Sequence, residues 1–302
     1  TKLKNRSEIL FLYDVTDANP NGDPVDENKP RIDEETGVNI VTDVRLKRTI
    51  RDYLYNYKGL EIFIREIRDE KGKLKTKEER LNEFKDYNDL INACIDIRLF
   101  GATTAVEEKT MTLTGPVQFK FGRSLHKVDL TYIKGTTVMP SAAGKAQGTF
   151  TEKYILPYSL IAFYGIVNEN LAKVQNIPLT EEDIYYMLEG MWHGTKNLTT
   201  GTKFGQVPRL LLQVIYKQDT YSYIGELDKR IKLVSDIEDE KIRDISQFKI
   251  DITNLVKALE ENKDKIERIK YKIDERLNLI KDGKDIKITE ALSQFDLQEL
   301  DF

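Results

Sequence analysis

The sequence predicts an α+β fold in which β-strands and helices alternate along the first 216 residues. Apolar runs rich in β-branched and aromatic residues are typical of strands, and such runs occur at residues 8–15, 109–121, 156–167 and 210–216. Two intervening segments, residues 43–58 and 180–192, repeat apolar residues every three or four positions instead. That spacing is typical of amphipathic helices.

Both predicted helices begin with a residue that favours an N-terminal cap. Thr42 precedes the first helix, and Thr180 precedes the second with Asp183 three positions later, which is a capping-box pattern. The order along the chain is therefore strand, helix, strand, strand, helix, strand. This is the split βαβ arrangement (βαββαβ) of ferredoxin-like folds, which RNA-recognition-motif-like domains share.

Three further segments extend this core of residues 1–216. Residues 59–95 are dense in charge and predict a helical insertion, and residues 128–149 are glycine-rich and basic and predict a protruding hairpin. Residues 217–302 predict a mainly helical region that packs on the core, most clearly at residues 252–280.

The composition limits the classes of function. The chain has 47 Lys and Arg against 51 Asp and Glu, for a net charge of -4, so any surface that binds nucleic acid must be local. One cysteine and two histidines exclude an intrachain disulfide and a zinc site built from His and Cys. No apolar run has the length of a signal peptide or a membrane span. We expect a cytoplasmic protein that needs no cofactor or metal and has no membrane partner.

The first helix has an unusual concentration of positive charge. Its polar face carries four cations, most of them near the N-terminus: Arg45, Lys47, Arg48 and Arg51. The helix dipole already places about half a positive charge there, and the first backbone N–H groups lack partners inside the helix. A phosphate group would satisfy both features, although an ordinary solvated helix face also has this pattern.

Two loops offer further cations. The loop at residues 193–205 mixes glycine, threonine and lysine, so Lys196, Lys203 and the following Arg209 are candidates for RNA contact, with a simple flexible connection as the alternative. The hairpin at residues 128–149 carries three further candidates: Lys134, Met139 and Lys145. Exposed apolar side chains on such a hairpin suit stacking against bases or docking on a neighbouring molecule; a mobile surface loop is the alternative.

Several short segments, in a fixed order, carry a resemblance to a known family. They are NPNGDP (residues 19–24), VTDVRLKRTIR (41–51), DIRLFG (96–101), TGPVQ (114–118) with RSL (123–125), YSL (158–160) and PRLLL (208–212). Together they resemble the repeated backbone subunit of type I CRISPR-associated Cascade complexes, the Cas-seven group, and within it the subtype I-B branch.

The resemblance implies a modified RNA-recognition fold whose copies form a filament along a guide crRNA, with residues 128–149 as its thumb. It implies that the cations of the first helix contact crRNA phosphates, and we expect Asn21 and Arg123 to join them. The guide would be presented for pairing with target DNA in antiviral defence. The expected partners are therefore guide crRNA, target DNA, further copies of the chain and other Cascade subunits.

Two other functions remain open from the sequence. In related type III backbone subunits a loop aspartate cleaves RNA, so Asp14, Asp17 or Asp23 would be the corresponding residue of a metal-dependent ribonuclease. A turn rich in Asp, Asn, Pro and Gly needs no chemistry to explain it, and we expect a protein that is not an enzyme. The C-terminal helices would otherwise form a protein interaction module.

Overall fold

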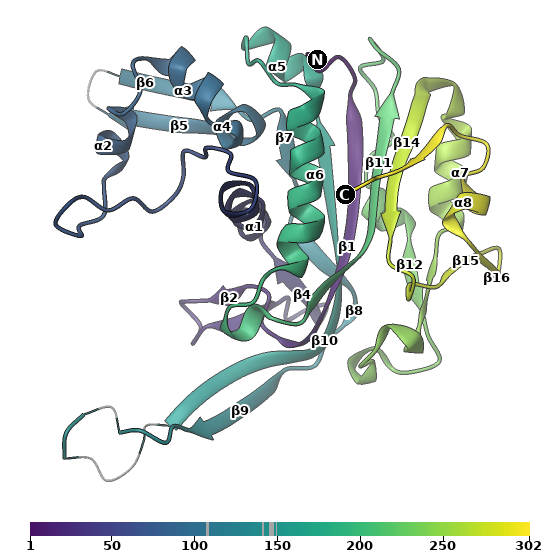
Figure 1. The fold of residues 1–302 in the computed structure, drawn as a ribbon. Helices are drawn as coiled ribbons and strands as arrows, with labels where there is room; N and C mark the ends of the chain where they lie inside the picture. The colour runs from purple at the N-terminus through teal and green to yellow at the C-terminus, as the bar shows by residue number, and fades with distance from the viewer. Residues whose placement is uncertain (107–108, 141, 145–147, 149) are drawn as a thin grey trace.

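The computed structural model describes residues 1–106, 109–140, 142–144, 148 and 150–302 (Figure 1). Within these residues, the largest sheet has 11 strands in the order β17-β14-β11-β1-β10-β8-β4-β3-β2, and β7 and β9 also pair with β10. Its strands are β1 (Ser7–Ala18), β2 (Gly22–Asp23), β3 (Lys29–Ile32), β4 (Val38–Val41), β7 (Val117–Phe119), β8 (Gly122–Lys127), β9 (Thr131–Thr136), β10 (Phe150–Val167), β11 (Gln206–Tyr216), β14 (Ile266–Ile273) and β17 (Leu297–Glu299).

Strand β1 lies at the centre of this sheet, antiparallel to β10 on one side and to β11 on the other. Its buried run explains the apolar sequence at residues 8–15, because both faces of the strand are covered. Phe11 and Tyr13 face the helices, whereas Leu10 and Leu12 face the C-terminal region. Together with the helices described below, this confirms the predicted α+β class.

Helices α1 (Asp43–Asn56) and α6 (Glu181–Lys196) cover one face of the sheet, and the short α5 (Glu169–Val174) precedes α6 (Figure 1). The predicted caps are confirmed: Thr42 Oγ1 accepts from the Arg45 N–H, and Thr180 and Asp183 form a capping box. The two helices approach closely because α6 has glycine at the contact. A Cβ atom on Gly194 would lie 3.1 Å from the Thr49 carbonyl oxygen.

The insertion between α1 and β7 contains α2 (Lys77–Leu81), α3 (Tyr87–Ala93), α4 (Ile95–Phe100) and the β5 (Gly101–Val106)–β6 (Lys109–Thr114) hairpin. Its apolar side chains, including the free Cys94, join the same core as α1 and α6. The predicted strand at residues 109–121 is divided into β6 and β7 at Gly115 and Pro116. The insertion thereby lies against one side of α1.

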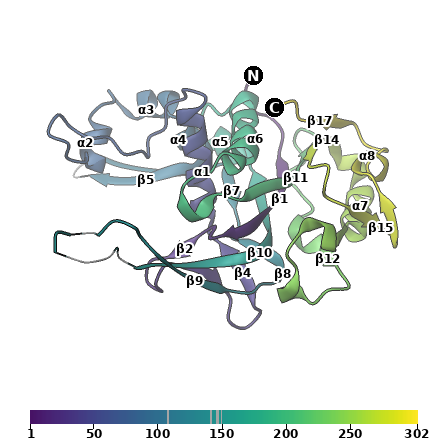
Figure 2. The same cartoon turned by 60° about the horizontal axis from the view of Figure 1, so that its bottom comes forward.

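The predicted hairpin projects from the rest of the molecule (Figures 1 and 2). Strand β9 pairs with the first part of β10, from Thr131 opposite Ile155 to Thr136 opposite Phe150. The second strand of the hairpin is therefore an extension of the core strand β10. The paired strands of the hairpin are residues 131–136 and 150–155, so the hairpin is displaced toward the C-terminus from the predicted 128–149.

The prediction of a mainly helical C-terminal region is wrong. Residues 217–302 contain α7 (Thr253–Glu261) and α8 (Ile288–Ala291), but also β14 and β17 of the large sheet and a four-stranded sheet. The strands of that smaller sheet are β12 (Lys232–Val234), β13 (Lys249–Asp251), β15 (Leu279–Lys281) and β16 (Lys284–Ile286). This region packs on the sheet face opposite α1 and α6.

The error has a physical reason in β14. Ile266, Ile269 and Ile273 are three and four positions apart, which is a helical spacing, whereas Ile269, Tyr271 and Ile273 alternate as in a strand. Pairing with the free edge of β11 decides in favour of the strand. Among the described helices, none is long and apolar enough to cross a membrane.

Candidate nucleic-acid interface

The N-terminus of α1 is held by the turn at residues 19–24. Asn21 Oδ1 accepts hydrogen bonds from the Thr42 N–H at 2.9 Å and from the Thr42 hydroxyl at 3.0 Å. Asn19 links this turn to the loop before β11, since its N–H donates to the Thr202 carbonyl at 2.7 Å. The structure thus brings together three segments that are distant in sequence: the turn, the start of α1 and the loop at residues 200–206.

Arg45 and Lys203 lie at this junction. Arg45 donates to the Thr49 hydroxyl at 3.3 Å, and its Nε is buried without a partner. Burial lowers the pKa of Arg45, and burial followed by the charge of Arg45 lowers the pKa of Lys203. In the described part of the chain neither side chain has a carboxylate in an ion pair with it. The charge of Asp52 opposes the shift of the Arg45 pKa without forming an ion pair. Two partly desolvated cations that lack a close carboxylate among the described residues form a candidate site for an anion.

Two side chains that sequence reasoning missed belong to the same junction. The Tyr13 hydroxyl is buried, which raises its pKa, and the nearby positive charge of Arg45 opposes that shift. Gln206 is buried as well, and its Nε2 has no hydrogen-bond partner among the described residues. In the sequence, Tyr13 and Gln206 are marked only as polar residues near the end of an apolar strand, which does not by itself indicate a binding site.

Lys47 and Arg48 already have carboxylate partners on their own helix. Lys47 pairs with Asp43 at 3.1 Å, and Arg48 pairs with Asp52 at 2.8 Å. Both side chains keep some exposure to solvent, 15% and 29% respectively. The helix therefore compensates part of its crowded positive charge internally, which the count of cations alone did not predict.

The placement of Arg51 on an exposed cationic face is wrong. Its side chain is buried and forms a 3.0 Å ion pair with Asp96 of α4. Asp96 also accepts hydrogen bonds from the Phe63 and Ile64 N–H groups at 2.7 and 3.1 Å. The insertion folds over this side of α1, and helical periodicity within α1 contains no information about that contact.

Arg209 is also buried and does not face solvent as an RNA contact would require. It pairs with Asp14 at 3.0 Å and with Asp274 at 2.8 Å, and the Tyr158 hydroxyl donates to Asp14 at 2.7 Å. Burial raises the pKa of Asp14, and the charge of Arg209 opposes that shift. This network joins β1, β11 and the C-terminal region, so its role is structural.

The same network bears on a metal site. Asp14 Oδ2 is held by Arg209 and Tyr158, whereas its buried Oδ1 has no hydrogen-bond partner among the described residues. Asp23 Oδ1 accepts from the Val25 N–H in an exposed turn. In the described ranges, no three His, Cys, Asp or Glu side chains gather as they would to hold a metal ion.

The remaining predicted residues lie apart from the junction. Lys134 is exposed over the Phe150 ring at 4.4 Å, and Met139 is 80% exposed, both on the projecting hairpin; Lys145 lies outside the described residues. Lys196 is exposed at the end of α6. Arg123 is half-exposed on β8 and pairs with Asp33 at 3.3 Å.

Comparison with known proteins identifies the family. The family profile described as "CRISPR-associated protein Cas7" matches residues 5–253. A protein of Haloferax volcanii named "CRISPR-associated protein Cas7" is 32% identical over 336 aligned residues, which cover 98% of this chain and 96% of that protein.

Solved structures give the same fold. A chain of a "CRISPR RNA-guided surveillance complex, pre-nicking" superposes with a TM-score of 0.58 at 12% identity, covering 98% of this chain and 96% of that one. A chain of a second "CRISPR RNA-guided surveillance complex" gives 0.53 at 16% identity, with 92% and 95% covered. Since the profile and the relative both extend over most of the sequence, this chain belongs to the Cas7 family of CRISPR-associated proteins.

Proposed function

We propose that this chain is a non-catalytic backbone subunit of a type I CRISPR Cascade complex, of the subtype I-B branch, that oligomerises along guide crRNA. The observation that carries the proposal is the pair of cations at the start of α1. Arg45 and Lys203 are partly buried, and the charge of Arg45 lowers the pKa of Lys203. Among the described residues neither has a carboxylate in an ion pair with it, although the charge of Asp52 acts on Arg45 from a greater distance. A phosphate of the crRNA backbone supplies the missing negative charge, independently of base sequence.

The topology supports a modified ferredoxin-like, RNA-recognition-motif-like core. The strands β11, β1, β10 and β7 are neighbours in that order and pair in antiparallel fashion. With α1 after β1 and α6 after β10, this is the neighbour order expected of a βαββαβ unit. The hairpin of residues 131–155 is the thumb in this proposal.

The covered sheet explains how such a core would bind RNA. In an RNA-recognition domain, aromatic side chains on the open sheet face stack on bases. Here the face that bears Leu10 and Leu12 is buried by the C-terminal region. RNA is therefore held beside the ends of the central strands β1 and β11, by the α1 junction, and by the exposed Lys134 and Met139 of the thumb. The bases stay available for pairing with target DNA.

The partners in this proposal are guide crRNA, target DNA, further copies of the chain and the other Cascade subunits, in the cytoplasm and without a cofactor. Five further residues are proposed as RNA contacts from exposed or partly exposed positions: Lys47, Arg48, Asn21, Arg123 and Lys196. The surveillance complexes that contain chains of similar fold support this assignment.

The test removes the two cations without introducing negative charge. The double variant Arg45→Gln/Lys203→Gln is titrated with single-stranded RNA over a series of salt concentrations by fluorescence anisotropy. Each lost phosphate contact lowers the slope of log K against log salt by about 0.7. The exposed Lys241 of the C-terminal region provides the control Lys241→Gln. An unchanged slope in the folded double variant would refute the assignment.

A second measurement tests the non-catalytic part of the proposal. The assembled complex is incubated with RNA complementary to the guide and with magnesium. We expect intact RNA; regularly spaced cuts that disappear in an Asp23→Ala variant would show that the chain is a ribonuclease instead.

A further inference from the structure

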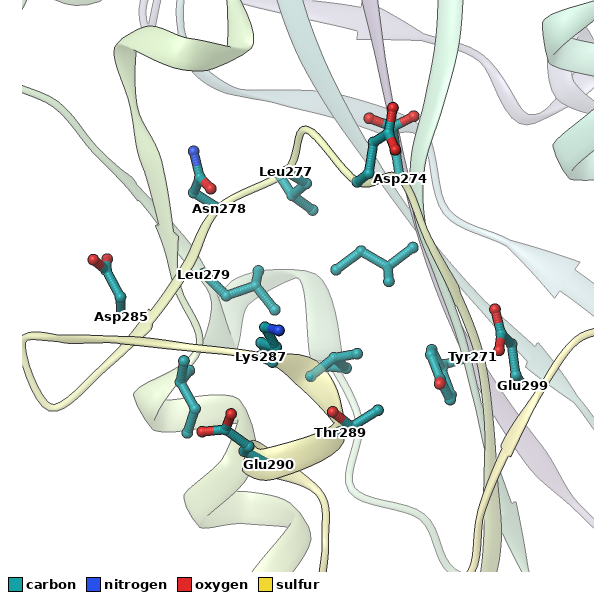
Figure 3. Close-up of a pocket in the computed structure, with 14 residues that line it drawn as sticks. Tyr271, Asp274, Leu277, Asn278, Leu279, Asp285, Lys287, Thr289, Glu290 and Glu299 are labelled. Atoms are coloured by element: carbon teal, nitrogen blue, oxygen red, sulfur yellow. The ribbon is translucent and has the colours of Figure 1, made fainter.

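The C-terminal region contains an open groove that the proposed RNA contacts do not use. It has a volume of about 600 Å³ and lies between β14, the loop that follows it, the β15–β16 hairpin and α8 (Figure 3). Side chains of the second apolar core form its floor. They are Tyr271, Ile273, Leu277, Leu279, Ile286 and Ile288.

The rim of this groove is acidic. Five carboxylates line it against one lysine, Lys287; they are Asp274, Glu275, Asp285, Glu290 and Glu299. Asp274 and Asp285 pair with Arg209 and Lys249 respectively, which lie outside the lining. Within the described part of the chain, no ion pair is formed by the other three, so their charge is available to a partner.

This charge decides what kind of molecule fits. Phosphate-rich nucleic acid would be repelled by the rim, and a neutral apolar segment would leave the three free carboxylates uncompensated. A segment with alternating apolar and basic side chains satisfies both parts of the site, because its apolar side chains cover the floor and its cations meet the rim.

We infer that this groove is a docking site for a cationic amphipathic segment of another protein. The site is separate from the α1 junction. It lies on the opposite side of the large sheet, since the C-terminal region packs on the face that α1 does not cover. A subunit that grips RNA at one surface thus presents an acidic, apolar surface for a protein partner at another.

The first test uses the full chain without RNA and a fluorescent synthetic peptide that alternates Leu and Lys. Glu290→Lys/Glu299→Lys reverses charge at two exposed rim positions and should weaken peptide binding by about tenfold or more. The matched control, Glu34→Lys/Glu70→Lys, makes the same change in net charge at exposed positions outside the groove and should keep the wild-type affinity. Equal affinities of the two double variants would overturn the inference.

A second peptide tests the floor. A peptide that alternates Ser and Lys keeps the charge but loses the apolar side chains, and it should bind more weakly to the wild-type chain than the Leu and Lys peptide. On an Ile286→Ser variant the two peptides should become more alike. If both peptides bind the wild-type chain equally, the site recognises charge alone and the groove is not a docking site.

The third test identifies the partner in the assembled complex. A photo-crosslinking residue replaces Ile286, and the cross-linked peptide is sequenced. A basic, apolar segment of a different subunit supports the inference, whereas a cross-link to RNA, to DNA or to a second copy of this chain overturns it. The peptide tests use no RNA, so their failure is distinguishable from a failure of the chain to bind guide RNA.

Discussion

Arg51 of α1 and Asp96 of α4 form a buried ion pair of 3.0 Å. The carboxylate of Asp96 is simultaneously held by the N–H groups of Phe63 and Ile64. The pair therefore fastens the insertion to the helix whose N-terminus forms the candidate interface. The pair positions α1, and because Arg51 is buried it is not one of the cations that α1 exposes to solvent.

Removing Arg51 should destabilise the protein strongly. In Arg51→Met the Asp96 charge stays buried without its cation, and such a loss costs about 3–5 kcal/mol. The comparison variant is Arg48→Met on the same helix, whose pair with Asp52 and hydrogen bond to the Ile64 carbonyl at 2.7 Å are partly exposed. An exposed pair of this kind is worth about 1 kcal/mol or less. Urea unfolding measures both free energies. Similar losses for the two variants would contradict the structural role of Arg51.

Lys203 should show a trade-off between stability and RNA binding. Lys203→Met removes the repulsion between two neighbouring cations and the cost of partly burying a charge, so the free energy of unfolding of the RNA-free protein should rise. The gain should be no more than about 1 kcal/mol, because Lys203 keeps some solvent contact. The same change should reduce the increase in thermal midpoint that single-stranded RNA gives the wild-type chain. Thermal unfolding with and without RNA measures both. A variant that loses RNA-free stability would argue against repulsion between Arg45 and Lys203.

His126 should make stability depend on pH. Its Nε2 accepts from the Leu160 N–H at 3.1 Å, and its Nδ1 lies 2.8 Å from the Lys127 carbonyl oxygen, an arrangement for a neutral ring. Burial lowers its pKa. Below the unfolded pKa of about 6.5 the unfolded chain therefore binds a proton that the folded chain does not. Stability is complete above that pH and falls as the pH decreases toward the folded value.

The variant His126→Gln should be less stable at neutral pH, and its deficit should shrink as the pH falls from about 7 to about 5. Urea midpoints over this range check the expectation. His193 also has a pKa lowered by burial, so some dependence persists in the variant. A deficit that stays constant with pH would mean that His126 is not neutral in the fold.

Close contact between α1 and α6 should make Gly194 intolerant of a side chain. A Cβ there would lie 3.1 Å from the Thr49 carbonyl oxygen and 3.1 Å from Tyr53 Cβ. Gly194→Val should cost about 1–3 kcal/mol by forcing the helices apart. Lys196→Val places the same side chain at an exposed position of the same helix and should cost less. Thermal or urea unfolding compares the two, and equal losses would indicate helix propensity as the cause.

Local patterns in the sequence determined much of this protein. The strands β1, β10 and β11, the helices α1 and α6, the caps at Thr42 and Thr180 and the break at Gly115 and Pro116 depend on neighbours a few positions apart. The resemblance to the Cas7 family was likewise readable from short segments in order, and the comparisons confirm it. The sequence also predicts the concentration of positive charge at the start of α1, because those cations lie within one or two turns of the same helix.

Only the tertiary structure decided which of these charges are free. Arg51 forms an ion pair with Asp96, and Arg209 forms ion pairs with Asp14 and Asp274. Arg45 and Lys203 are 158 positions apart in the sequence, yet they lie at the same junction, and neither has a carboxylate in an ion pair with it among the described residues. The strand β14 was likewise decided by pairing with β11. The physical reason is the same in each case: burial, ion pairing and sheet pairing depend on long-range contacts, which periodicity and composition do not encode.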